Sequence, residues 1–290
     1  MEHFFVITNK SKDKDFYIAK DIKKYLEDRD KTCVIATDYG QDDTREFSTD
    51  ISEIPPDTQG VIVLGGDGTM LQAANDLARC DLPILGVNLG NLGFLTDIDK
   101  KQLYPALHQL IEDNYTLEKR MLIDGKYVNE KGDTVSNLAL NDVVINKGHC
   151  YHLVCVKVYI NGKLLDIYIA DGIIVSSPTG STGYNLSAGG PVMVPSMKAM
   201  IITPICPHSL NNRSLVVSAE DEIVLEIGNT RENGHDEGIL IMDGMVQRTL
   251  YTGESIKIKQ AMDHIKLIKL NGMNFFDVFH NKLGMGKESI

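Results

Sequence analysis

The chain has 290 residues, of which 43% are hydrophobic and 24% are charged, values typical of a globular protein and far from those of a disordered chain. At about 100 to 200 residues per domain, this length favours two domains over a single small binding module. Forty acidic against 29 basic side chains give a formal charge of -11, which repels nucleic-acid backbones and anionic membranes. We therefore expect neither a nucleic-acid partner nor a membrane partner.

The five cysteines are widely spaced and never arranged as CxxC, so the sequence suggests neither a disulfide framework nor a zinc site, and no residue is assigned as a metal ligand. The N-terminal residues lack a basic region followed by a long apolar stretch, which disfavours a secretion signal. No apolar run approaches the roughly 18 residues of a membrane span. We expect a cytoplasmic protein.

Residues 1 to about 120 alternate short apolar runs with amphipathic stretches, the pattern of strands and helices that take turns around a parallel sheet. We predict an α/β, Rossmann-like domain over residues 1–120, with a parallel sheet. Its predicted strands are Phe4–Thr8, Cys33–Ala36, Val61–Leu64 and Pro83–Val87. Its predicted helices run through Ile18, Ile22 and Leu26, over Thr69–Arg79 and over Leu103–Glu112.

From about Tyr115 the apolar runs become β-branched and alternating, which predicts a mostly antiparallel β domain over residues 121–265. The clearest signal is Asn161-Gly162 between two such runs, because Asn-Gly tolerates the positive φ angles of a two-residue hairpin turn. Residues 266–290 are expected to pack back on the N-terminal domain. The predicted strands are Val154–Ile160, Lys163–Ala170, Met200–Ile205, Glu222–Ile227, Gly238–Met242, Ser255–Lys259 and Ile265–Leu270.

A glycine-rich turn, Gly65-Gly66-Asp67-Gly68-Thr69, follows one buried strand and opens a helix. Glycines let the backbone approach a ligand closely, and the free N–H groups at a helix start favour bound phosphate. The Asp67 carboxylate can accept a proton from an attacking hydroxyl or hold magnesium. The alternative is a tight turn in which Asp67 only caps its helix.

A second glycine-bearing turn, Asn88–Thr96, follows the next strand and contains Phe94. We expect it at the same carboxyl-end edge of the sheet, where open α/β folds bind their ligands. Taken alone, its glycines indicate an ordinary structural turn more often than a ligand site.

Three further features lie in the β-rich half. The segment Asp171–Pro191 is dense in hydroxyls and glycines and carries Tyr184, whose ring can cover a flat base; it suits either a nucleotide or a surface loop whose hydroxyls satisfy local backbone groups. Asn141-Asp142 can bond ribose hydroxyls or adenine edges, but is also common turn chemistry. His152 alone is more often a satisfied or exposed histidine than a ligand contact.

These pieces, taken together and in this order, resemble the NAD kinase family, which phosphorylates the adenosine-ribose 2′-hydroxyl of NAD to make NADP. GGDGT alone is shared with lipid kinases of the diacylglycerol type, whereas the serine, threonine and glycine segment is much more specific. The matching stretches are GGDGT at 65–69, NLGNLGFLTD at 88–97, LND at 140–142, DGIIVSSPTGSTGYNLSAGGP at 171–191, and Phe275-Phe276-Asp277-Val278 with Lys282-Leu283-Gly284.

The resemblance implies NAD and ATP as substrates, Mg²⁺ or another divalent cation as cofactor, Asp67 as proton acceptor, and a homodimer or homotetramer. This chain has Gly183 where many members have alanine, and Met245 where many have glutamine, so no contact is assigned to Met245. The implied substrate and cofactor contacts are Gly65, Gly66, Gly68, Thr69, Phe94, Asn141, Asp142, His152, Asp171, Thr182, Gly183, Tyr184, Asn185, Leu186 and Ser187.

Two alternative functions stay open at this point. One is a lipid or other small-molecule kinase that shares the phosphate loop, which should expose an apolar or basic membrane-docking surface. The other is a non-catalytic NAD(P) sensor, which would have no need of Asp67.

Overall fold

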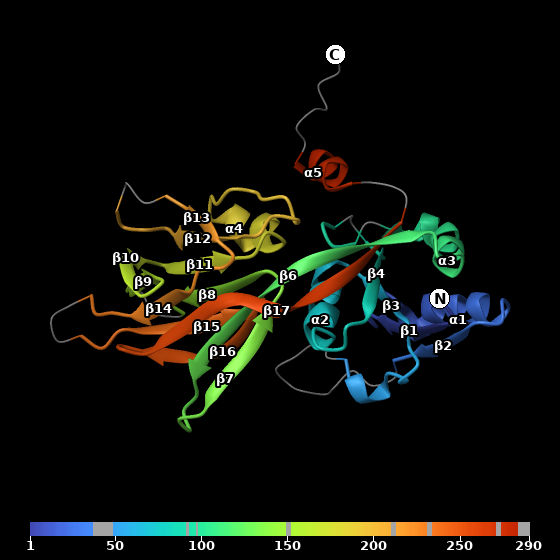
Figure 1. The fold of residues 1–290 in the computed structure, drawn as a ribbon, viewed down its shortest axis with the longest axis horizontal. Helices are drawn as coiled ribbons and strands as arrows, with labels where there is room; N and C mark the ends of the chain where they lie inside the picture. The colour runs from blue at the N-terminus through green and yellow to red at the C-terminus, as the bar shows by residue number, and fades with distance from the viewer. Residues whose placement is uncertain are drawn as a thin grey trace, which may run out of the picture. The chain divides into compact units, whose positions relative to one another are not determined.

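The computed structural model describes residues 1–36, 49–90, 93–96, 98–148, 152–209, 213–230, 234–270 and 274–283. The chain divides into two compact units (Figure 1): unit 1 comprises Met1–Lys119 and His264–Ile290, and unit 2 comprises Arg120–Asp263. Strands β6 (Tyr115–Val128) and β17 (Ser255–Leu270) have residues in both units. Within the described ranges, no helix has the length and apolar character needed to cross a membrane.

Unit 1 is built on a parallel sheet, as the sequence predicts. Its strands are buried on both faces by helices, which explains why they appear in the sequence as near-continuous apolar runs. The two-residue strand β5 (Ile98–Asp99) and residues Lys266 and Leu267 of β17 both pair in parallel with β4. The main strand order is β2 (Thr32–Ile35), β1 (His3–Thr8), β3 (Gly60–Gly65), β4 (Pro83–Asn88).

The helices of unit 1 lie on opposite faces of this sheet. Helices α1 (Tyr17–Glu27) and α3 (Leu103–Ile111) share a core cluster with Leu85 and Val87 of β4. Successive residues of a strand point to opposite faces, and a Cβ at Gly86 would lie 3.3 Å from the Met70 sulfur of α2 (Asp67–Asp76). Helix α2 therefore covers the other face. Helix α5 (Phe275–Leu283) follows β17.

Unit 2 is antiparallel apart from short helical turns, in agreement with the predicted β-rich half. Its two sets of strands pack over one core, to which Ile145, Ile173, Val158 and Leu225 contribute. The first set runs β13 (Leu215–Ser218), β12 (Ala199–Ile205), β11 (Gly172–Ser176), β8 (Asp142–Asn146), β15 (Glu237–Met242), β16 (Met245–Tyr251). The second set runs β10 (Lys163–Ala170), β9 (Val154–Ile160), β14 (Ile223–Ile227), β17. Outside this order, β7 (Thr134–Ala139) pairs with β6.

One hairpin is confirmed in detail and one pair of strands is corrected. Asn161 and Gly162 adopt φ angles of 50° and 76° between β9 and β10, as the Asn-Gly turn requires. The two strands predicted over Ser255–Lys259 and Ile265–Leu270 are one continuous strand, β17. The intervening residues 260–264 contain no glycine or proline, so nothing there interrupts the strand.

Candidate functional site

The glycine-rich turn joins β3 directly to α2. The helix begins at Asp67, two residues earlier than predicted, and Gly66 precedes it without any side-chain cap. Asp67 therefore lies in the first helical turn, and the interpretation of Asp67 as a helix cap is wrong. A Cβ at Gly65 would lie 2.4 Å from the Thr69 hydroxyl oxygen, whereas one at Gly68 would meet nothing within 4 Å. Gly65 thus permits close packing, and Gly68 leaves the loop open.

The Asp67 carboxylate is held by the second glycine turn. Its Oδ2 accepts the Phe94 N–H at 2.7 Å, and its Oδ1 accepts the Leu95 N–H at 3.1 Å and the Thr96 hydroxyl at 3.3 Å. A carboxylate offers about four acceptor positions, so one position on Oδ2 remains open toward the described residues. The Asp67 side chain is 36% exposed. Its orientation is fixed while one oxygen stays available.

Glycine at position 93 allows this contact. A Cβ there would lie 1.6 Å from the Asp67 Oδ1, so any larger residue would displace the carboxylate or the turn. The Asn88 amide donates to the Thr96 hydroxyl at 3.1 Å, which ties the end of β4 to the same contact. The expectation that both turns meet at one edge of the sheet is confirmed. Residues Asn91, Leu92 and Asp97 of the predicted motif lie outside the described residues.

Two lysines that were given no role in the sequence analysis reach this turn. The Lys12 ammonium lies 3.0 Å from the point where a Gly66 Cβ would be. The Lys282 ammonium of α5 lies 3.8 Å from the Asp67 Oδ2. In a chain of charge -11, these two cations place local positive charge where a helix N-terminus already favours an anion.

In unit 2, a single carboxylate positions Asn141 and Asp142. Asp243 lies in the turn between β15 and β16 with φ 49°, and its side chain accepts the N–H groups of Leu140 at 2.6 Å, Asn141 at 2.8 Å and Asp142 at 2.9 Å. Asp243 is a positioning residue that sequence reasoning missed, because Asp-Gly at a hairpin is ordinary turn chemistry.

The Asp142 side chain is a buried acid. It is 6% exposed, and no described side chain or backbone group forms a hydrogen bond or ion pair with it. Burial, together with the neighbouring negative charge of Asp243, raises the pKa of Asp142 to about 7. Burying a carboxyl group costs stability, because its charged form loses contact with water. Carboxyl groups that are nevertheless buried and change protonation near neutral pH are typical of functional sites.

The hydroxyl-rich segment after β11 is largely folded onto itself. Ser177, Ser181 and Asn185 are fully buried, so the interpretation as a surface loop is wrong for them. The Asn185 amide donates to Ser181 O at 3.1 Å and Pro191 O at 2.9 Å and accepts from Thr203. These groups hold the segment in shape, and Asn185 can bind a ligand through its side chain only by exchanging partners.

The accessible part of this segment lies beside Asn141. A Cβ at Gly183 would lie 3.9 Å from the Asn141 amide nitrogen and 3.2 Å from Gly180 O, so glycine leaves space there that alanine would fill. Tyr184 is 42% exposed. Thr182 and Leu186 are half-buried, and Ser187 is exposed. Gly183 places this short segment next to Asn141, and we refer to Asn141, Asp142 and residues 182–187 together as the Asn141 group.

Asp171 and His152 lie apart from that group. Asp171 pairs with Lys147 at 2.7 Å, at the end of β11 opposite Ser177. The six residue steps from Asp171 to Ser177, on either side of β11, span roughly 20 Å at about 3.4 Å per residue. The structure therefore places the predicted contacts of unit 2 in two locations.

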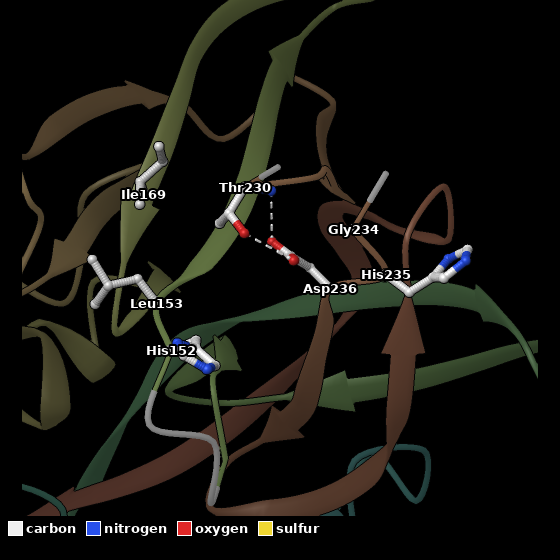
Figure 2. Close-up of a pocket in the computed structure, with 7 residues that line it drawn as sticks. All are labelled: His152, Leu153, Ile169, Thr230, Gly234, His235 and Asp236. Carbon is white, nitrogen blue, oxygen red and sulfur yellow. Dashed lines mark hydrogen bonds between the residues drawn. The ribbon is translucent and has the colours of Figure 1, made fainter. Parts of the chain in front are cut away.

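His152 lines a pocket of about 400 Å³ near the Asp171 end of unit 2. Thr230 and Asp236 point toward each other across it (Figure 2), and the Asp236 carboxylate accepts the Thr230 N–H at 2.9 Å and its hydroxyl at 3.0 Å. His152 is the only sequence-predicted contact among the described residues that line this pocket, which are His152, Leu153, Ile169, Thr230, Gly234, His235 and Asp236.

Comparisons with known proteins cover both units. The ATP-NAD kinase N-terminal domain model matches residues 4–115, and the ATP-NAD kinase C-terminal domain model matches residues 140–270. The NAD kinase of Lachnoclostridium phytofermentans is 42% identical over 98% of this chain and 99% of its own. The NAD kinase of Lachnospira eligens is 38% identical over 98% of this chain and 100% of its own.

Two solved structures share the fold. Yeast NADH kinase complexed with NADH has a TM-score of 0.82 at 23% identity, covering 100% of this chain and 89% of that one. An NAD kinase from Archaeoglobus fulgidus in complex with ATP has a TM-score of 0.73 at 24% identity, covering 97% of each chain.

Proposed function

The chain belongs to the NAD kinase family, and from that premise we propose that Asp67 accepts the proton when the adenosine-ribose 2′-hydroxyl of NAD takes the γ-phosphoryl group of ATP. The observation that carries this proposal is the Asp67 carboxylate, fixed by Phe94 and Leu95 at a helix N-terminus with one acceptor position left on Oδ2. Family membership favours this function over the lipid-kinase and sensor alternatives.

The geometry fits phosphoryl transfer because this reaction depends on positioning and charge neutralisation more than on a strong base. The 2′-hydroxyl donates its hydrogen to the open position on Oδ2, and its oxygen attacks the γ-phosphorus while ADP leaves. Since Asp67 is already held by three donors, little reorganisation is needed when the proton arrives.

The triphosphate of ATP is proposed to bind at Gly65–Thr69, with Lys12 as a further ligand. The support is the open backbone at Gly68 and the Lys12 ammonium above Gly66. A kinase that uses a nucleoside triphosphate needs a divalent cation, and Mg²⁺ is our proposal because it is commonly held by one or two carboxylates together with substrate phosphates. The 2′-hydroxyl takes the open position on Asp67, so the phosphate oxygens of ATP would chiefly hold this cation, and it would neutralise their charge.

NAD is proposed to contact Asn141, Asp142 and the segment 182–187. The support is the space at Gly183 beside the Asn141 amide, the exposed Tyr184 ring, which can stack on a base, and the buried Asp142 carboxyl, which can accept or donate a hydrogen bond near neutral pH.

A homodimer or homotetramer is proposed from β10. This strand ends its sheet order and exposes Leu165, Ile167 and Ile169 to between 40% and 48%, an apolar edge that is prone to pair with a second copy. A second copy can also supply Asp171, which lies roughly 20 Å along β11 from the Asn141 group. Light scattering coupled to size-exclusion chromatography should give the mass of a dimer or a tetramer. A monomer at assay concentration would contradict the proposed assembly.

A cytoplasmic location is proposed because the widely spaced cysteine thiols of this chain suit a reducing compartment.

The test is incubation of the purified protein with NAD, ATP and MgCl₂, followed by an NADP-specific dehydrogenase. We expect NADP, with the new phosphate on the 2′ position. No NADP from folded protein would contradict the proposal. Phosphorylation of lipid in vesicles would then support a lipid kinase, and NAD binding without turnover would support a sensor.

A further inference from the structure

Helix α5 has a well-defined start close to the C-terminus. The Asn274 side chain accepts the N–H groups of Phe276 at 2.8 Å and Asp277 at 3.0 Å, and the Asp277 carboxylate accepts the Asn274 N–H at 2.9 Å. This reciprocal arrangement satisfies the free donors at a helix start. It fixes the residue at which α5 begins.

One face of α5 is directed at Phe94. Phe275, Phe279 and Lys282 are spaced at i, i+4 and i+7, which places them on one side of a helix. The Phe275 ring lies 6.0 Å from the Phe279 ring and 6.3 Å from the Phe94 ring, between centroids. Phe94 is the residue whose N–H donates to Asp67, so the aromatic contacts align α5 with the reaction centre.

Lys282 extends this face to the carboxylate itself. Its ammonium lies 4.6 Å from the centre of the Phe94 ring, within the range of a cation–π contact, and 3.8 Å from the Asp67 Oδ2. The second distance is too long for a hydrogen bond, so the ammonium keeps donors for another acceptor. It lies beside the oxygen that has the open position.

We propose that Lys282 is a catalytic residue whose ammonium binds the phosphoryl group during its transfer; this inference rests on the proposed function. The bond between the 2′-oxygen and the γ-phosphorus forms, the bond between the γ-phosphorus and the β,γ-bridging oxygen breaks, and the electron pair leaves with ADP. The hydroxyl proton passes to Asp67, and Lys282 stays protonated. A fixed cation beside the equatorial oxygens stabilises charge that develops in the transition state.

A purely structural role makes a different prediction. An ion pair that is partly exposed contributes about 0 to 1 kcal/mol, and its loss should lower stability slightly without a selective effect on turnover. Lys266 provides a matched control in the same unit: it pairs with Asp81 at 2.7 Å and its side chain is 22% exposed, compared with 29% for Lys282.

The experiment compares Lys282→Met, Lys282→Gln, Lys282→Arg and Lys266→Met by kcat, by KM for NAD and ATP, and by melting temperature. We expect Lys282→Met and Lys282→Gln to lower kcat about 100-fold, with smaller changes in KM and melting temperature close to that of the wild type. Lys282→Arg should keep more activity than either, and Lys266→Met should turn over normally. Lys282→Ala should regain activity with added methylammonium.

Several results would overturn the inference. These are a kcat within twofold of wild type in folded Lys282→Met or Lys282→Gln, a loss equal to that in Lys266→Met, and absence of rescue by methylammonium in folded Lys282→Ala. The wild type and Asp67→Asn distinguish this failure from that of the proposed function. An active wild type with inactive Asp67→Asn and normal Lys282 variants sinks the inference alone, whereas an inactive wild type sinks the proposed function.

Discussion

The glycine turn of unit 1 and the hydroxyl-rich segment of unit 2 are both polar, but they use their polar groups differently. Asp67 is fixed by donors from another turn and still keeps an exposed oxygen. Ser177, Ser181 and Asn185 are fully buried and bond mainly to backbone groups near them. The many hydroxyls therefore stabilise the conformation of their own segment, whereas the half-exposed Asp67 carboxylate is the group proposed to take part in the reaction. Substitutions around Asp67 should therefore lower activity, and substitutions in the hydroxyl-rich segment should lower stability.

Among substitutions that test this comparison without changing the carboxylate itself, the largest effect is expected at Gly93. In Gly93→Ala the new methyl group would overlap Oδ1 of Asp67, and a displacement of about 1 Å at a reacting group can cost about 100-fold in rate. We expect kcat to fall by about that factor while the fold is retained. Gly60→Ala is the control, because its methyl group would approach closely only the flexible Met1 side chain and would lie at ordinary contact distance, 3.9 Å, from the Phe4 ring. Steady-state kinetics measure kcat, and circular dichroism checks that the fold is retained. An unchanged kcat in Gly93→Ala would contradict the close contact between position 93 and Asp67.

Asp142→Asn should stabilise the protein at high pH. The native pKa of Asp142 is about 7, above its ordinary value of 3.8, so the native state holds this proton more tightly than the unfolded chain. The contribution of this proton to wild-type stability is fully present below pH 4 and is lost progressively as the pH rises to about 7. The side-chain amide that replaces the carboxyl group in the variant cannot ionise, so the variant does not share this loss.

The free energy of unfolding of Asp142→Asn should exceed that of the wild type by on the order of 4 kcal/mol at pH 8, and the difference should vanish near pH 4. Urea unfolding of the ligand-free protein across this pH range measures it. Glu130→Gln removes an exposed carboxylate and should show no such pH dependence. A constant difference for Asp142→Asn would argue against the raised pKa.

A smaller loss of stability is expected at Asn185. In Asn185→Ala three bonded groups around a fully buried amide lose their partner, which should lower the free energy of unfolding by about 2 kcal/mol. The exposed Ser187→Ala serves as the control and should unfold as the wild type does. If Asn185→Ala kept full stability yet lost NAD binding, Asn185 would be a direct contact instead of a structural one.

Local signals in the sequence were sufficient for much of the fold. Buried parallel strands appear as continuous apolar runs, and Asn161-Gly162 specifies a turn through its own backbone preferences. Strand β17 was divided in two because its middle, around the fully exposed Met262, lacks an apolar pattern. No local rule states that a strand continues through such a stretch.

The candidate site was easiest to recognise where its residues are contiguous. Gly65–Thr69 stand together in the chain, so the proposed phosphate-binding turn could be identified from the sequence. Lys12 and Lys282 were not assigned a role, because an isolated lysine looks like a solvated one until folding brings it to a site. The same holds for Asp243, whose carboxylate positions Asn141 and Asp142 from about 100 residues away.

The most direct measurement is NADP formation by Asp67→Asn next to the wild type, with NAD binding measured on the same samples. The variant keeps the size of the side chain but replaces one carboxylate oxygen with a donor. We expect NAD binding to persist and turnover to fall by about 1,000-fold, near the middle of the range for loss of a positioned general base. Turnover near the wild-type rate in folded Asp67→Asn would contradict the assignment of Asp67 as proton acceptor.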